Sequence, residues 1–279
     1  MTLRSRASLR AGAPPTSLRS RYSSAVRILA IDTSSEIGAV ALLDGGAVRA
    51  SMQARVMHQH GETLLPHVDR VLALAGLTVR DVGLLAIGLG PGSFTGVRIG
   101  VATAKGLALA HNTPMIGVRT SRVLARAATG ALRLVAIDAK KDEVFVSAYA
   151  AGPDGSLTPV LEDAYGAPAE VFTRLARLVR ERGVAEGDVS LVGSALSLHG
   201  TALDEALPGI LRLPEVLSAP SAALLAQEAL EAHTSRGPDD PAALVPIYVR
   251  GADAKLPATR EPPAREPPPT REPPRPAGR

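Results

Sequence analysis

The hydrophobic positions of residues 28–118 follow strand and helix periods in turn. Short apolar runs predict buried strands, and apolar residues spaced three and four apart predict helices with one buried face. Asp44-Gly45-Gly46 separates two of the runs and has the composition of a β-hairpin turn. The predicted elements are strands at 28–31, 37–43 and 47–52, a helix at 62–75, a strand at 82–88 and a helix at 95–110.

A similar order recurs over residues 132–233, and the first strand of each half ends in an aspartate, Asp32 or Asp138. Two βββαβα halves predict an α/β protein with the actin-like ATPase (ASKHA, ribonuclease H-like) architecture, in which two lobes surround a cleft. We expect the N-terminal lobe to span residues 26–118 and the C-terminal lobe residues 119–251. The repeated elements are strands at 132–137, 143–149 and 158–161, a helix at 168–180, a strand at 189–192 and a helix at 221–233.

The two ends of the chain lack this patterning. Residues 1–25 are rich in Arg and Ser and contain no acid, which is typical of a transit peptide and equally of a start codon assigned too early. The abrupt start of the periodic sequence at Val26 favours the second interpretation. Residues 252–279 repeat Arg-Glu-Pro-Pro three times. Proline without apolar residues cannot bury a core, so this segment is predicted to be a disordered tail rich in Pro, Arg and Glu.

Charge and composition narrow the function classes. The net charge of +4 comes from the two ends, because residues 28–251 hold 19 basic and 23 acidic residues. A folded body of this sign lacks the basic surface that binds a polyanion, so any role with RNA is expected to run through a partner. The chain has no cysteine, which excludes disulfides and thiol chemistry and fits a reducing, cytoplasmic compartment. Because no apolar run reaches the ~18 residues that span a bilayer, no membrane contact is expected.

The most specific stretch is the glycine-rich segment 88–100, which lies between a predicted strand and a predicted helix. Glycines there let the backbone turn sharply and approach a neighbour closely, and a hydroxyl can cap the helix. The free N–H groups of a helix start also suit an anion. Two readings stay open, a tight packing turn and a nucleotide or anion loop. The residues of the candidate loop are Gly90, Gly92, Ser93 and Thr95.

This segment also resembles a known family, the TsaB (YeaZ) family, and the likeness covers about residues 27–256. The string Gly-Pro-Gly-Ser-Phe-Thr-Gly-Val-Arg at 90–98 is the longest match. The other matching segments are Ile-Leu-Ala-Ile-Asp-Thr-Ser at 28–34, His60 with Leu-Leu-Pro at 64–66, Lys-Gly-Leu-Ala-Leu at 105–109, Pro-Met-Ile-Gly-Val at 114–118, Ala-Ile-Asp-Ala at 136–139 with Glu-Val at 143–144, and Pro-Ile-Tyr-Val-Arg at 246–250.

The resemblance implies an actin-like fold and a role in making N6-threonylcarbamoyladenosine beside the tRNA anticodon. It implies that this subunit is not an enzyme but pairs with a TsaD-like catalytic subunit, works with a TsaE-like ATPase, and reaches tRNA through the complex. The catalytic relative carries a His-x-x-x-His metal motif, whereas residues 119–123 here hold no histidine. We therefore expect no catalytic residue, no metal site and no cofactor bound tightly by this chain alone. ATP with Mg²⁺ stays open as a ligand of the complex.

Two other sets of residues could hold a cation. His58, His60 and His67 form the only histidine cluster, and surface or interface histidines explain it with fewer assumptions than a metal site. Asp32 and Asp138 end the first strand of each half, where actin-like kinases hold Mg²⁺ and nucleotide. The glycine-rich turn that cradles nucleotide is missing after Asp32, so capping of the turn is favoured for both.

The helix at 95–110 is apolar over more than the ~100° arc that a sheet-covering helix needs. We therefore expect a second surface to cover it, either the other lobe or a partner. The resemblance favours a partner, because in TsaB this helix and the one before it pack against the matching pair of TsaD or of another TsaB, so a homodimer is also open. On this basis Val97→Glu or Val101→Glu should leave a folded chain that no longer pairs. The predicted partner-interface residues are Leu64, Leu65, Val68, Leu72, Val97, Gly100, Val101, Ala104 and Ala108.

A function of another class stays open on the residues alone. A self-sufficient enzyme of the actin-like class, such as a small-molecule kinase, would show the same two halves. Such a kinase should bind Mg²⁺ and ATP tightly and turn ATP over by itself, whereas a scaffold subunit should be inert alone.

Overall fold

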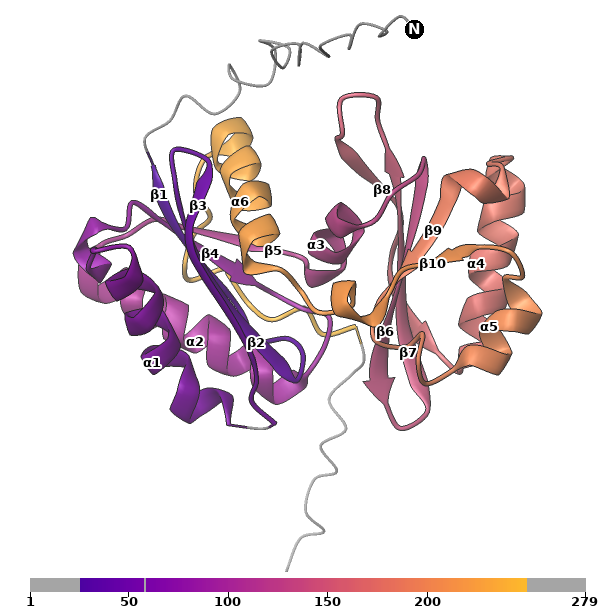
Figure 1. Cartoon of the computed structure of the whole chain (residues 1–279), viewed down its shortest axis with the longest axis horizontal. Coiled ribbons are helices and arrows are strands. Elements are labelled where there is room, and N and C mark those ends of the chain that lie inside the picture. The colour runs from indigo at the N-terminus through magenta and orange to yellow at the C-terminus, as the bar shows by residue number, and fades with distance from the viewer. Residues whose placement is uncertain (1–25, 58, 250–279) are drawn as a thin grey trace, which may run out of the picture.

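The computed structural model describes residues 26–57 and 59–249, and it shows two α/β lobes side by side (Figure 1). The elements of the first lobe are β1 (Arg27–Asp32), β2 (Ile37–Asp44), β3 (Ala47–Arg55), α1 (His60–Leu74), β4 (Leu84–Gly88), α2 (Phe94–His111) and β5 (Met115–Val118). The elements that follow are α3 (Thr120–Ala127), β6 (Leu132–Lys140), β7 (Glu143–Ala151), β8 (Leu157–Gly166), α4 (Pro168–Arg182), β9 (Val189–Val192), α5 (Gly200–Ala206), β10 (Leu211–Arg212) and α6 (Ala222–Arg236). Short 3₁₀ turns lie at Val79–Asp81, Glu186–Asp188 and Glu215–Leu217.

Both five-stranded sheets have the same strand order. The first is β3-β2-β1-β4-β5 and the second is β8-β7-β6-β9-β10. In each sheet three consecutive strands pair antiparallel. The fourth strand pairs parallel with the first strand of that half, and the fifth pairs parallel with the fourth. This repeated topology confirms the predicted fold class, a pair of βββαβα lobes of the actin-like type.

The β2–β3 hairpin shows how local sequence sets the register. Asp44 pairs with Ala47, and the two residues between them, Gly45 and Gly46, have φ angles of +58° and +80°. A two-residue turn with positive φ at both positions matches the twist of the strands, and glycine adopts it without a steric cost. The predicted hairpin is therefore confirmed.

The first sheet is covered on both faces. On one face α1 and α2 pack against Leu29, Val40 and Ile87, and on the other face α6 packs against Ile28, Leu84 and other inward side chains. Figure 1 shows α6 on the opposite side of this sheet from α1 and α2. A sheet buried on both faces explains why β1 and β4 read as continuous apolar runs instead of alternating ones.

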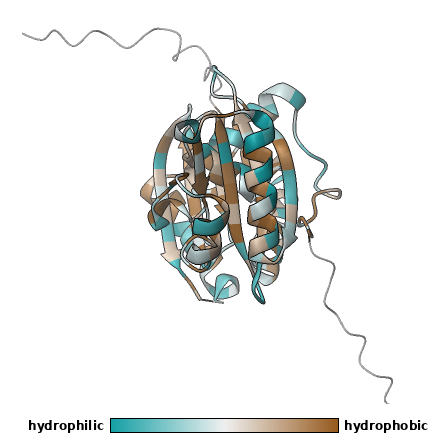
Figure 2. Cartoon of the chain, turned by 90° about the vertical axis from the view of Figure 1, so that its right-hand side faces the viewer, coloured by the Kyte–Doolittle hydropathy of each residue, from teal (hydrophilic) through white to brown (hydrophobic). Residues whose placement is uncertain are grey.

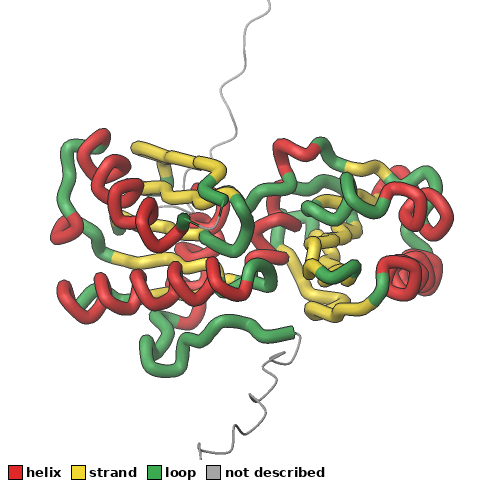
Figure 3. The backbone as a smooth tube through the Cα atoms, turned by 90° about the horizontal axis from the view of Figure 1, so that it is seen from below, coloured by secondary structure: helices red, strands yellow, loops and turns green. Residues whose placement is uncertain are grey.

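The second sheet is enclosed in the same way. Helices α4 and α5 cover its outer face, and α3 covers the face that looks toward the first lobe. Figure 2, seen from the second lobe, shows apolar brown positions concentrated on the strands. Figure 3, seen from below, shows the two lobes as separate groups of strands and helices joined by crossing segments. The two helices α3 and α6 therefore form the layer between the sheets.

The predicted boundary between the lobes is wrong in one respect. The segment 119–251 was assigned to the C-terminal lobe, but α6 packs on the first sheet, where Leu225, Ala226 and Ala229 are buried. The chain thus leaves the first lobe at the end of β5 and returns to it after β10. Four short elements were not predicted from the sequence, namely α3, α5, β5 and β10.

The predictions for residues 1–25 and 252–279, and for His58, lie outside the described residues. Within the described ranges, no helix is long and apolar enough to cross a membrane.

Candidate functional site

A buried polar network holds the end of β1. Asp32 Oδ1 accepts hydrogen bonds from the Ser34 N–H at 2.8 Å and the Ser34 hydroxyl at 2.6 Å, and Asp32 Oδ2 accepts one from the Thr120 hydroxyl at 3.0 Å. Burial raises the pKa of the Asp32 carboxyl, and the hydrogen bonds from Ser34 and Thr120 act in the opposite direction. The carboxyl thus caps the turn after β1 and links it to α3, which confirms the turn-capping interpretation.

The glycine-rich loop between β4 and α2 packs directly on the segment that follows β1. A Cβ on Gly92 would lie 2.2 Å from the Ser34 carbonyl oxygen, and a Cβ on Gly96 would lie 2.0 Å from the Thr33 carbonyl oxygen. The Thr33 hydroxyl also donates to the Gly96 carbonyl at 2.7 Å. Only glycine permits this approach, so the start of α2 is fixed against the end of β1.

Several N–H groups of this loop are paired within the chain. The Gly90 N–H donates to the Thr120 hydroxyl at 3.2 Å, the Ser93 N–H to the Ser34 carbonyl at 2.6 Å, and the Gly96 N–H to the Ser93 hydroxyl at 3.2 Å. These hydrogen bonds are the ones expected of a tight packing turn, which the sequence left open beside an anion-binding loop. Anion binding stays a prediction for the four residues concerned, which are Gly90, Gly92, Ser93 and Thr95.

The corresponding aspartate of the second lobe is paired with a lysine. Asp138 Oδ1 accepts a hydrogen bond from the Lys140 N–H at 2.8 Å, and Asp138 Oδ2 lies 2.9 Å from Lys140 Nζ. The hydrogen bond with Asp138 raises the pKa of the Lys140 ammonium, which also lies 3.4 Å from Glu36 Oε1 in the first lobe. Asp138 therefore also caps its own turn, and Lys140 bridges the two lobes.

The two described histidines of the cluster, His60 and His67, lie in different surroundings on α1. His60 is buried at the start of α1, where its Nε2 lies 2.8 Å from the Ser35 carbonyl oxygen. His67 is partly buried further along the same helix. Across residues 26–57 and 59–249, no group of three or more His, Cys, Asp or Glu side chains is placed to hold a metal ion.

Most of the predicted partner-interface residues lie in the core of the first lobe. Eight of the nine are buried against the chain's own sheet or against the neighbouring helix, and only Leu65, 49% exposed, reaches the surface. Because α2 packs on both the sheet and α1, it uses a broad apolar arc without any partner. The eight residues that are corrected in this way are Leu64, Val68, Leu72, Val97, Gly100, Val101, Ala104 and Ala108.

A different set of apolar and small residues faces solvent on the two helices. Leu109 of α2 is 88% exposed, and a Cβ added at Gly106 would meet no atom within 4 Å. Ala102, Gly106 and Ala110 are exposed and four residues apart, so they form one ridge on which another helix could lie closely. The outer helix face consists of Leu65, Ala102, Gly106, Leu109 and Ala110. The spacing of the three small residues was visible in the sequence, but the orientation of the ridge was not.

Beside this face, an aromatic cluster joins the start of α2 to the segment after α6. The Phe94 and Tyr248 rings are 5.4 Å apart, and the Arg98 guanidinium carbon lies 3.7 Å from the centre of the Phe94 ring. Arg98 Nε also donates to the Tyr248 hydroxyl at 3.1 Å. The exposed end of α2 therefore carries an aromatic pair and a stacked arginine, side-chain types enriched where proteins bind one another.

Comparison with protein families and curated proteins gives one consistent result. Residues 53–257 match the family model described as TsaD, tRNA N6-adenosine threonylcarbamoyltransferase. The tRNA threonylcarbamoyladenosine biosynthesis protein TsaB of Escherichia coli K12 is 41% identical over 160 residues, which are 56% of this chain and 69% of that protein. TsaB of Haemophilus influenzae is 40% identical over 124 residues, so the match spans 43% of this chain and about half (52%) of that relative.

Solved structures agree with the sequence comparisons. YeaZ from Pseudomonas aeruginosa has a TM-score of 0.66 and 28% identity to this chain, and the alignment covers 80% of this chain and 99% of that one. A second Pseudomonas aeruginosa structure, described as an uncharacterized protein with similarity to peptidase YeaZ, gives a TM-score of 0.67 at 29% identity, over 81% of this chain and 100% of that one.

Proposed function

Because the chain belongs to the TsaB family, within the wider TsaD-type family, we propose that it is a docking subunit for tRNA threonylcarbamoyladenosine synthesis and not itself the catalyst. The observation that carries the docking role is the outer helix face. Leu65 of α1 and Leu109 of α2 expose apolar area there, and α2 also carries the exposed ridge of small residues. A contiguous exposed apolar surface often marks a site of protein–protein contact.

The interior of the chain supports a non-catalytic role. In an actin-like kinase the two strand-end aspartates would hold Mg²⁺ and nucleotide, but here both are engaged by the chain itself. Asp32 caps its turn with Ser34 and Thr120, and Asp138 is paired with Lys140. Residues 119–123, where the catalytic relative has its metal motif, contain no histidine. These side chains fix the positions of the loops instead of presenting a reacting group.

The partner that fits best is a TsaD-like catalytic subunit. A family model for that transferase matches this chain, so the catalytic protein is expected to share the fold and to present a matching helix pair. Two similar helix pairs can pack as a four-helix bundle, with the small residues allowing the axes to come close. A TsaE-like ATPase and tRNA would join through the complex, and a homodimer through the same face would be the resting form in the absence of the partner.

Leu109→Asp tests the docking face. Because Leu109 is 88% exposed, the substitution costs the free chain little, but it places a charge within the proposed apolar contact. We expect affinity for the TsaD-like subunit to fall by about tenfold or more, measured by isothermal titration calorimetry. In a reconstituted transfer reaction with the TsaD-like subunit, the TsaE-like ATPase, ATP, Mg²⁺, a preformed activated threonylcarbamoyl donor and tRNA, the variant should give correspondingly less threonylcarbamoyladenosine.

Leu198→Asp is the matched control, since Leu198 is 60% exposed but lies in the second lobe. It should bind and support the reaction like the parent chain, and both variants should keep the parental melting temperature. Parental affinity in Leu109→Asp would contradict the assigned face. Modified tRNA formed by the purified chain alone would contradict the non-catalytic role.

A further inference from the structure

Helix α3 contributes to the cores of both lobes although it is only eight residues long. Val123 is buried in the core that α6 and the first sheet share, whereas Leu124 and Ala125 are buried against the second sheet. The helix thus lies in the layer between the lobes. Apart from Ala127, its other side chains are polar, and they carry the contacts from which the inference follows.

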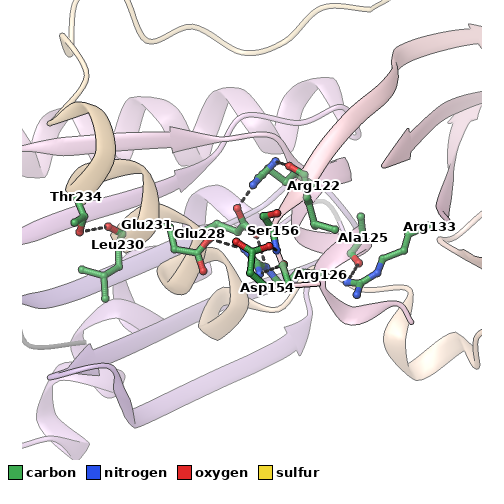
Figure 4. Close-up of polar contacts among 12 residues, drawn as sticks. Arg122, Ala125, Arg126, Arg133, Asp154, Ser156, Glu228, Leu230, Glu231 and Thr234 are labelled. Atoms are coloured by element: carbon green, nitrogen blue, oxygen red, sulfur yellow. Dashed lines mark hydrogen bonds and ion pairs between the residues drawn. The ribbon is translucent and has the colours of Figure 1, made fainter. Parts of the chain in front are cut away.

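Two arginines of α3 meet one buried carboxylate of the first lobe. Glu228 of α6 is only 3% exposed, and it accepts hydrogen bonds from Arg122 Nε at 2.5 Å and from Arg126 Nε. Figure 4 shows both guanidinium groups directed at Glu228, with Glu231 one turn further along α6. Glu231 also accepts from Arg126, at 2.7 Å, but its side chain is 44% exposed.

The same two arginines also hold the second lobe. Arg122 donates to the Leu157 carbonyl at 2.7 Å, and Arg126 donates to the Gly155 carbonyl at 2.9 Å, both in the connection from β7 into β8. Each guanidinium therefore joins a helix of the first lobe to the hairpin of the second. Arginine suits such a bridge because its planar group offers several donors in fixed directions.

A second buried carboxylate fixes the start of α3 to the other lobe. Asp163 of β8 has a side chain only 2% exposed, and it accepts hydrogen bonds from the Ser121 hydroxyl at 2.7 Å and from the Ser147 hydroxyl at 2.5 Å, and it pairs with Arg119. The Ser121 hydroxyl also lies 2.8 Å from the Tyr149 hydroxyl. Helix α3 is thus held by one buried acid from each lobe.

We infer that Arg122, Arg126 and Glu228, together with Asp163, form an interlobe clamp that holds the two lobes in one relative orientation. If the lobes rotated apart, the guanidinium groups would have to leave either the carbonyls of the hairpin or Glu228. If they left Glu228, its charge would stay in an apolar layer without these partners. If they left the hairpin, the two carbonyls would lose their donors. Both outcomes are unfavourable. Proteins of this architecture that close on a ligand need mobile lobes, so a clamp of this kind suits a chain that presents a fixed surface.

The absence of cysteine makes the interlobe distance directly measurable. Cysteines introduced at Ser51 of β3 and Arg180 of α4, both exposed, take one spin label each, and pulsed electron resonance then gives the distance distribution between the lobes. We expect one narrow distribution in the parent chain. Glu228→Met removes both acceptors at similar side-chain length, and it should broaden the distribution and shift its mean by several ångströms.

Glu231→Met is the matched control, because Glu231 lies on the same helix and binds the same Arg126 but is half exposed. It should keep the parental distribution. Should Glu228→Met fail to fold, Arg122→Met gives the same test from the other side of the pair. A parental distribution in the folded clamp variant, whatever its melting temperature, would overturn the clamp, and so would an equal shift in Glu231→Met.

The test is independent of the proposed function, since it is made on the purified chain without any partner. The outer helix face lies on the opposite side of the first sheet from α6. A clamp variant should therefore still bind the TsaD-like subunit if the docking proposal is right, and loss of docking in Leu109→Asp should leave the interlobe distance unchanged. The two proposals can fail separately.

Discussion

Val97 and Ala102 lie on the same helix, five positions apart, in opposite surroundings. Val97 is only 3% exposed and packs in the core between α2 and the first sheet, whereas Ala102 faces solvent on the ridge of small residues. Apolar character alone does not distinguish them, because both side chains would suit a protein interface. Their position around the helix axis decides which one belongs to the fold and which one is available to a partner.

Val97→Glu should therefore destabilise the chain and not only its pairing. A carboxylate placed in this core has neither water nor a cation beside it, so we expect the free energy of unfolding to fall by about 3 kcal/mol or more. Ala102→Glu should change the free energy of unfolding by no more than about 0.5 kcal/mol and should still weaken docking. Urea unfolding followed by circular dichroism measures the stability of both variants. A folded Val97→Glu variant of parental stability would contradict the assignment of Val97 to the core.

At the scale of elements, the sequence predicts the helices and strands that have strong hydrophobic periodicity, and it misses the short ones. The three-strand meander of each half and the long helices α1, α2 and α4 all follow from apolar spacing and turn residues. The predicted strand end at Asp32 is confirmed, whereas β6 continues past Asp138 to Lys140. Helix α3 has eight residues and β10 has two, and such short segments fix too few positions for a period to be recognised. Their structure is determined by tertiary contacts, as the packing of α3 on both lobes shows.

The candidate site likewise contains features that the sequence predicts and features that it does not. The glycine string before α2 predicts a close backbone approach from composition alone, and the structure confirms one against Thr33 and Ser34. Eight of the nine predicted interface residues lie in the core instead, because the breadth of an apolar arc does not tell whether a sheet, a helix or a partner covers it. The pairing of Glu228 with Arg122 spans 106 positions in the chain, and no local pattern indicates it.

Two glycines of α2 offer a direct test of how this element is used. A Cβ on Gly96 would lie 2.0 Å from the Thr33 carbonyl oxygen, whereas a Cβ on Gly106 would meet nothing. Gly96→Ala should force α2 away from β1 and lower the free energy of unfolding by about 1–3 kcal/mol. Gly106→Ala should raise it by about 0.5–1 kcal/mol, because alanine is the better helix former. Thermal unfolding of the two variants under identical conditions measures both changes, and a Gly96→Ala variant at least as stable as the parent chain would contradict the close contact at Gly96.

At the scale of the whole molecule, the chain builds its first lobe from two separate segments. The first sheet is complete by the end of β5, but one of its faces stays uncovered until α6 arrives, after the entire second lobe. The second lobe is continuous in sequence, and its sheet is covered by α3 on one face and by α4 and α5 on the other. The two lobes therefore differ in how far each can fold without the rest of the chain.

Isolated segments should show this difference. Residues 119–214 carry the second sheet with both its covering layers, and we expect them to melt cooperatively. Residues 26–118 leave Ile28, Leu84 and Ile116 on an open sheet face, so we expect them to bind a hydrophobic dye and to melt without a cooperative transition. Joining residues 219–249 to residues 26–118 through a flexible linker restores α6 and should restore cooperative melting in a calorimeter. If residues 26–118 melt cooperatively by themselves, α6 is dispensable for the first lobe, and its packing on that sheet contributes to the orientation of the lobes alone.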